Sequence, residues 1–154
     1  MEIIELVERS NTDQNKKLSN CYSTFGKLIS ELRKKEIPSE IVDRVNRDIE
    51  GINLFSGSNR ELLKLLRKVQ YGILKLIEKE LKLVPRNHYR NMWLAIGMAA
   101  FGIPFGVVFG ISLGNMAFLG VGIPIGMAVG IGIGSAMDKK ALDDDRQLDL
   151  EITN

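Results

Sequence analysis

The feature that most constrains this chain is an uncharged segment 47 residues long, at positions 91–137. A helix of about 20 apolar residues crosses the hydrocarbon core of a bilayer, which is about 30 Å thick. The segment is therefore long enough for two crossings that are joined by a tight turn. We place the turn at Gly114-Asn115 and the two spans at residues 92–114 and 116–137.

Within this segment the same glycine pattern is written twice. Each copy is Gly-Ile-Pro-x-Gly followed by two more glycines at intervals of four residues; the eight glycines are Gly102, Gly106, Gly110, Gly114, Gly122, Gly126, Gly130 and Gly134. Each glycine costs a helix about 1 kcal/mol relative to alanine. Lipid offers no hydrophobic drive for helix association, so close backbone contact has to offset that cost. The pattern therefore predicts that these glycines pack helix against helix.

The sequence does not decide which helix each of the two glycine faces packs against. One face can pack on the other span while the second packs on a neighbouring chain, or both can close within one chain. Additional glycines make the later span small on more than one side: Gly120, Gly130, Gly132 and Gly134. Such a surplus of small contact surface suits two contacts better than one, so we expect a homo-oligomer.

Each glycine repeat carries one proline, Pro104 in the first and Pro124 in the second. An antiparallel hairpin sets the two prolines at similar depth, and each can kink its helix because it removes a backbone hydrogen bond. One interpretation is a hinge or pore constriction at that level. The other is ordinary packing of kinked helices.

Basic and aromatic residues flank the uncharged segment. We assign to the membrane interface Lys82, Arg86, Tyr89 and Arg90 before the first span, Trp93 at its start, and Lys139 and Lys140 after the second span. Tyrosine and tryptophan are enriched at the headgroup level, and lysine and arginine mark the cytoplasmic side. The turn carries no charge, and the acidic start of the chain is not typical of a secretory signal. Both termini are therefore expected in the cytoplasm.

Residues 1–84 have the pattern of a cytoplasmic helical domain. Apolar residues at spacings of three and four predict one helix within residues 1–35 and a second from Ser39 to about Phe55. Ser58 and Glu61 match a capping box, which predicts the start of a long third helix. We therefore predict three helices packed around a small core.

The complete prediction is an all-α membrane protein in which a two-helix transmembrane hairpin follows an N-terminal cytoplasmic three-helix domain. Residues 85–91 form a juxtamembrane linker, residues 92–137 the hairpin and residues 138–154 an acidic cytoplasmic tail. The tail holds 3 Lys+Arg against 6 Asp+Glu. Its alternating residues 148–152 suit a short strand, an amphipathic edge or a disordered tail equally.

Several short motifs carry a likeness to known sequences. They are Lys79-Glu-Leu-Lys82, Asn87-His-Tyr-Arg-Asn-Met-Trp93, the two Gly-Ile-Pro-x-Gly repeats, Gly114-Asn-Met-Ala117, Gly134-Ser-Ala-Met-Asp-Lys-Lys-Ala141 and Arg146-Gln-Leu148. Over residues 79–152, nearly half of the chain, the sequence resembles the glycine zipper family of small, largely uncharacterised bacterial two-span membrane proteins. The resemblance implies helix packing in the bacterial inner membrane, and it implies no reaction.

The residues that usually carry enzyme chemistry are sparse. Cys21 and His88 are the single cysteine and the single histidine, so one chain offers neither a multi-histidine metal site nor a catalytic triad. The chain has no Walker-type glycine loop, which leaves nucleotide binding without support. Basic residues of the third helix alternate with Glu78 and Glu80, which favours a solvated face or contact with anionic lipids over nucleic acid. We predict no enzyme, no cofactor and no metal.

Two functional hypotheses follow. The first is a homo-oligomer packed through glycine faces that forms a pore or permeabilises the membrane. The lack of charge within the spans argues against a selective filter. The alternative is a non-conducting membrane anchor or scaffold whose helical domain recruits a cytoplasmic protein partner.

Overall fold

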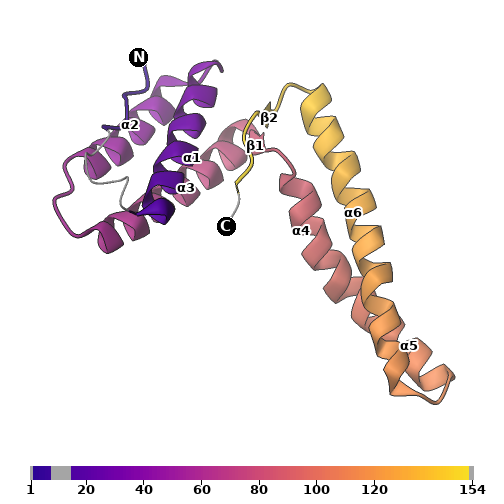
Figure 1. Ribbon diagram of the computed structural model, residues 1–154. Coiled ribbons are helices and arrows are strands. Elements are labelled where there is room, and N and C mark those ends of the chain that lie inside the picture. The colour runs from indigo at the N-terminus through magenta and orange to yellow at the C-terminus, as the bar shows by residue number, and fades with distance from the viewer. Residues whose placement is uncertain (1, 8–14, 153–154) are drawn as a thin grey trace. The chain divides into compact units, whose positions relative to one another are not determined.

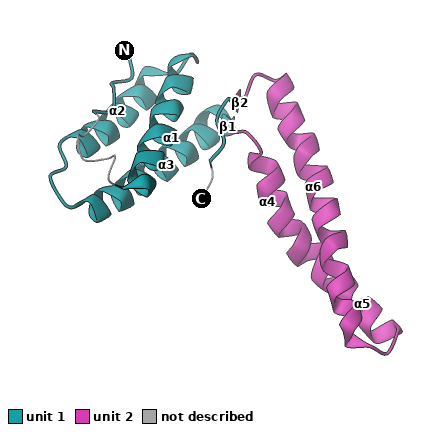
Figure 2. Cartoon of the chain, in the orientation of Figure 1, with its two compact units in different colours: residues 1–84, 148–154 teal, residues 85–147 magenta. Residues whose placement is uncertain are grey.

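The computed structural model describes residues 2–7 and 15–152 and is mainly helical (Figure 1). In chain order the elements are α1 Lys16–Arg33, α2 Ser39–Asn53, α3 Asn59–Leu81, β1 Val84–Pro85, α4 His88–Gly97, η1 Met98–Gly102, α5 Ile103–Ser112, η2 Met116–Phe118, α6 Leu119–Asp143 and β2 Gln147–Leu148. The chain divides into two compact units, residues 1–84 with 148–154 and residues 85–147 (Figure 2). Strands β1 and β2 pair where the chain passes from one unit to the other.

The first unit contains the three predicted helices. Helix α1 begins after Asn15, whose side-chain oxygen accepts the open backbone N–H groups of Lys17 and Leu18. The predicted capping box opens α3: the Ser58 N–H donates to the Glu61 carboxylate at 3.0 Å, and the Glu61 N–H donates to the Ser58 hydroxyl at 3.4 Å. These contacts satisfy amides that the first turn of a helix leaves open, so the starts of α1 and α3 are set by local sequence.

The core of this unit is built from the apolar faces of the three helices. Its largest fully buried side chains are Phe25, Leu18, Leu28, Leu32, Ile49, Ile52, Leu62, Leu66, Ile73, Ile77, Leu148 and Val45. Burial of such a side chain stabilises a fold by about 1.5–3 kcal/mol. The spacing of three and four residues in the sequence therefore corresponds to a real contact face.

The helix predicted within residues 1–35 is α1, and residues 2–7 before it are not helical. They lie along α2, where the Asn46 side chain accepts the Ile4 N–H at 2.9 Å and Asn53 accepts the Val7 N–H at 3.0 Å. Two asparagines seven residues apart lie on the same side of a helix, two turns from each other. The two side-chain amides hydrogen-bond to the backbone of residues 2–7, as the backbone of a neighbouring strand would. These contacts hold Ile3 in the core.

The alternating residues near the C-terminus belong to the first unit. Leu148 and Leu150 are buried in its core, and the Asp149 N–H donates to the Glu31 carboxylate at 3.0 Å. Lys34 also contacts Glu31, and this hydrogen bond holds the pKa of the Glu31 carboxyl below its usual value. Of the three alternatives for residues 148–152, the structure has a short strand at Gln147–Leu148 followed by packed apolar residues.

The second unit is an antiparallel helical hairpin. One helical run covers His88–Ser112 and the other covers Met116–Asp143, and both are long and apolar enough to cross a membrane. The second run ends six residues after the predicted end of its span at residue 137. The turn lies at Gly114-Asn115, as predicted: Gly114 has φ 64°, and the Asn115 side chain accepts the Ala117 N–H at 2.9 Å. A left-handed backbone is readily adopted by glycine, which explains Gly114 at this position.

Candidate functional site

The two glycine series face each other along the hairpin. A Cβ atom added to Gly122 would lie 2.6 Å from Gly106 Cα, and one added to Gly126 would lie 2.5 Å from Gly102 N. At the far end of the hairpin, a Cβ on Gly134 would lie 2.5 Å from Arg90 Cα. Ordinary contacts of a Cβ atom begin near 3.4 Å, so only glycine fits at these positions. The helix backbones touch, and both series are used within one chain.

Two glycines at the turn differ from the rest. A Cβ on Gly110 would lie 3.1 Å from the sulfur of Met116, which is a contact with a flexible side chain rather than with backbone. Gly114, which the repeat predicts as a packing glycine, does not contact the other helix within this chain: a Cβ added to it would meet nothing within 4 Å among the described residues. It ends the helix in the left-handed conformation that forms the turn.

Gly97 belongs to the contact face, although the repeat does not include it. A Cβ on Gly97 would lie 2.8 Å from Gly130 Cα and closer still to the Gly126 carbonyl. Gly97 precedes Gly102 by five residues, and the intervening segment η1, Met98–Gly102, is a π-helix. A π-helix bonds each N–H five residues back, so its wider turn returns Gly97 and Gly102 to one face. A search for a spacing of five before the first repeat would have found it.

The prolines flank the level where Gly102 meets Gly122. Pro104 follows the π-helical turn and stands near the start of α5, while Pro124 lies inside α6. Each stands two residues after its glycine, and the helices are antiparallel, so the prolines lie on opposite sides of that level. Proline has no N–H to donate to the preceding turn. A π-helical turn precedes Pro104, whereas Pro124 stands within a continuous α-helix.

Asp138 ties the open end of the hairpin together. Its side chain is buried, and its two oxygens accept the backbone N–H groups of Tyr89 at 3.0 Å and Arg90 at 2.9 Å. These amides lie in the first turn of α4, where they have no partner within the helix. Asp138 thus caps α4 from the neighbouring helix α6, and the negative charge suits the positive end of the α4 dipole. No local pattern predicts this role of Asp138, since 48 and 49 positions separate the partners in the chain.

The predicted interface residues are spread over several elements. The Trp93 carbonyl packs against Gly130, and the rings of His88 and Tyr89 meet edge to face at 5.1 Å. Lys139 and Lys140 lie exposed on the last turns of α6, and Arg86 lies exposed before α4. Lys82 is in the first unit, where it ends α3 with φ 58°.

Beyond the hairpin contacts, α6 ends in a charged turn. The Arg146 guanidinium donates to Asp144 at 2.6 Å and holds the pKa of that carboxyl below its usual value. Exposed charged residues therefore follow directly after the apolar run in the sequence.

The outer surface of the hairpin is apolar on all sides. Its exposed large side chains are Met92, Ile96, Phe101, Ile103, Phe105, Val108, Phe109, Ile111, Leu113, Met116, Phe118, Val121, Ile123, Ile125, Val129, Ile131, Ile133, Met137 and Leu142. Surfaces of this kind are rare on soluble monomers. Gly120 and Gly132 also lie outside the contact, and a Cβ on either would meet nothing within 4 Å.

The hairpin offers packing surfaces and no reactive cluster. Throughout the described residues, no group of three or more His, Cys, Asp or Glu side chains could hold a metal ion. Cys21 belongs to the first unit and His88 to the second. No protein-family model, no curated protein and no solved structure matches this chain.

Proposed function

We propose that this protein is a non-conducting two-span membrane anchor that carries its three-helix domain on the cytoplasmic side of a bacterial inner membrane. The observation that carries the proposal is the use of both glycine series inside one hairpin, where the helix backbones meet at Gly102, Gly122 and Gly126. A closed contact of this kind needs no second chain. The apolar exterior then matches lipid on every side.

The lack of a polar lining supports an anchor over a pore. Within residues 91–137, the polar side chains besides the juxtamembrane Asn91 are Ser112, Asn115 and Ser135. Ion pathways through proteins are lined by carbonyl rings, by charged rings or by water-filled polar walls. The hairpin is helical outside its turn, and the carbonyls of a helix interior accept hydrogen bonds within their own helix. The first unit has an apolar core of its own, so it can fold as a separate domain on the anchor. Recruitment of a cytoplasmic protein partner by this domain is part of the proposal.

The orientation rests on charge. Lys139 and Lys140 follow the second span, Arg86 and Arg90 precede the first, and the Gly114-Asn115 turn has no charge. Under the positive-inside rule this distribution keeps both termini in the cytoplasm, and the basic residues suit anionic lipid headgroups.

Self-association is the second candidate function. On α6 the outward positions Gly120, Pro124, Ala128, Gly132 and Ala136 recur every four residues, and all are exposed. The hairpin does not explain why Gly120 and Gly132 are glycine, because neither contacts the other helix. A second copy that approaches this small face would explain both.

Ion flux from liposomes tests the anchor directly. Full-length protein is reconstituted over a series of protein-to-lipid ratios. Release of ions, reported by the fluorescence of an entrapped ion-sensitive dye, is compared with that from protein-free liposomes and from liposomes with Gly126→Leu. We expect background release at every ratio. Release above background that disappears in Gly126→Leu contradicts the anchor and supports a pore built on the intact hairpin.

Stoichiometry in lipid nanodiscs tests self-association. Gly132→Leu places a large side chain on the outward small face, and Val129→Leu is the matched control because it enlarges an exposed apolar neighbour on the same helix. If the small face is an interface, the wild type and Val129→Leu are oligomers while Gly132→Leu is a monomer. A monomeric wild type rejects this candidate and leaves the anchor intact.

A further inference from the structure

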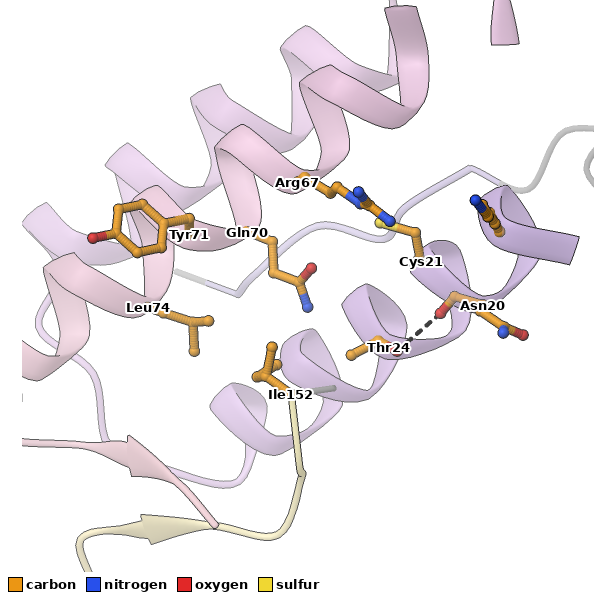
Figure 3. Close-up of a pocket in the computed structure, with 9 residues that line it drawn as sticks. Asn20, Cys21, Thr24, Arg67, Gln70, Tyr71, Leu74 and Ile152 are labelled. Carbon is orange, nitrogen blue, oxygen red and sulfur yellow. Dashed lines mark hydrogen bonds between the residues drawn. The ribbon is translucent and has the colours of Figure 1, made fainter. Parts of the chain in front are cut away.

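A groove in the first unit lies between α1 and α3 and has a volume of about 700 Å³ (Figure 3). Its helical walls include Lys17, Cys21 and Thr24 on α1 and Arg67, Gln70 and Leu74 on α3. They recur at intervals of three and four on both helices, so one face of each helix forms one wall. This volume lies within the range of about 300–1,000 Å³ that is typical of small-molecule sites.

The groove has a cationic end and an apolar end. Arg67 lies beside Cys21, and Lys17 stands one helical turn before Cys21 on α1. Leu74 and Ile152 lie toward the other end (Figure 3). No acidic residue lines the groove, and across the described residues neither Lys17 nor Arg67 forms an ion pair. The positive charge is therefore not neutralised by the walls.

Gln70 lies between these ends and is the strongest sign of a missing partner. The residue is 7% exposed, its side-chain Nε2 is fully buried, and this nitrogen has no hydrogen-bond partner among residues 2–7 and 15–152. Figure 3 shows its amide directed into the groove toward Thr24 and Ile152. A buried donor without an acceptor destabilises the fold, so such groups usually have a partner in their functional state. An oxygen atom of a ligand would supply the acceptor.

We propose that this groove binds a small amphiphilic anion, with its anionic head between Lys17 and Arg67, an oxygen accepting from Gln70 Nε2, and a short aliphatic body against Leu74 and Ile152. The inference goes beyond the anchor function and does not depend on it, because every residue involved is in the first unit. A free alkyl phosphate or carboxylate and an anionic membrane lipid share this chemistry. The experiment below separates the two sources.

Cys21 provides a reporter inside the site. It is the only cysteine of the chain, its side chain is buried at the groove, and burial raises the pKa of its thiol while Arg67 partly counteracts that effect. A ligand in the groove blocks access to the sulfur. Full-length protein in nanodiscs of neutral lipid is treated with N-ethylmaleimide, and the rate of Cys21 modification is measured against the concentration of decyl phosphate below its micellar range.

We expect decyl phosphate to slow the modification in a saturable manner. Arg67→Gln should raise the half-saturating concentration about tenfold or more, because a hydrogen bond to a charged group is worth roughly 1.5–3 kcal/mol. Lys17→Gln should act in the same direction. Lys68→Gln is the matched control, since it removes one charge from α3 outside the groove, and it should leave the concentration dependence unchanged. The comparison uses half-saturation, so a changed basal reactivity of Cys21 does not affect it.

Gln70→Leu gives a signature that a structural role would not give. It removes the unpartnered donor, so the empty protein should be equally stable or more stable to heat, while the half-saturating concentration of decyl phosphate rises. A variant that is less stable, and binds as the wild type does, contradicts the role assigned to Gln70.

The remaining arms decide the chemistry and the source. Inorganic phosphate that protects as well as decyl phosphate rejects the aliphatic body, and 1-decanol that protects equally rejects the anionic head. Absence of protection by decyl phosphate, or equal behaviour of Arg67→Gln and Lys68→Gln, overturns the site. Protection in nanodiscs with phosphatidylglycerol and no added ligand identifies membrane lipid as the source, whereas protection that requires added decyl phosphate identifies a free anion. None of these results depends on whether the protein conducts ions or spans the membrane. The proposed anion site can therefore be rejected while the anchor function stands, and the anchor function can be rejected while the site stands.

Discussion

Gly126→Ala adds one methyl group where the two helices touch, and its effect follows from the geometry. The new Cβ would lie 2.5 Å from Gly102 N and 2.7 Å from Gly102 Cα, against an ordinary contact of at least 3.4 Å. Both neighbours are backbone atoms, so no side chain can rotate away. The helices must separate by about 0.9 Å, the difference between 3.4 and 2.5 Å, and a gap of about 0.5–1 Å already loses a quarter to a half of each dispersion contact.

The resulting loss of stability should be about 2 kcal/mol, within the 1–3 kcal/mol typical of an overpacked interior. Gly132→Ala is the matched control, because it lies on the same helix and its Cβ meets nothing within 4 Å. That variant should gain up to about 1 kcal/mol from the better helix propensity of alanine. The same methyl group is thus expected to have opposite effects at two positions six residues apart.

Reversible unfolding in mixed micelles with increasing SDS measures both changes. The single tryptophan, Trp93, packs its backbone against Gly130 in the hairpin contact, so its fluorescence reports separation of the helices. If Gly126→Ala is as stable as Gly132→Ala, the helix backbones do not meet at Gly126 and the packing described for the hairpin is refuted.

Three further results are expected. Asp138→Ala should destabilise the hairpin by about 1–2 kcal/mol, since it removes the cap of α4, and Asp138→Asn should lose less; SDS unfolding checks both. Gly114→Ala should cost about 1–2 kcal/mol in the same assay, because alanine is strained at φ 64°. The pKa of Glu31 is lowered in the fold, so its contribution to stability is present above the ordinary glutamate pKa of about 4.3 and is lost as the pH falls through its lowered pKa. The protection of the Asp149 amide against hydrogen exchange, measured relative to the intrinsic rate at each pH, should then fall, and in Glu31→Gln it should lose this pH dependence. Protection at Asp149 that stays constant on acidification would show that Glu31 does not hold this segment.

Much of the fold could be predicted because its signals are local. The Ser58 and Glu61 box, the stripes of α2 and α3, and the turn at Gly114 each depend on residues within a few positions of one another. The glycine repeat also predicted a contact face, but sequence alone left open whether its partner was the same chain. In the structure the two series meet within one hairpin.

The parts that were missed depend on partners far apart in the chain. The Asp138 cap joins residues 48 and 49 positions apart, and the bond from Asp149 to Glu31 spans 118 positions. Gly97 escaped notice because the π-helical turn changes the spacing from four residues to five. Contacts between residues so far apart depend on how the helices pack against one another. The spacing of apolar residues along the chain does not determine that packing.

Sidedness of two introduced cysteines in a Cys21→Ser background tests the central claim that the hairpin crosses a membrane. Asn115 is exposed at the turn, and Glu151 is exposed after α6 in the C-terminal segment. In oriented inner-membrane vesicles, an impermeant thiol reagent should modify Asn115→Cys from one side and Glu151→Cys from the other. Modification of both residues from the same side would contradict a membrane-spanning hairpin and the anchor function built on it.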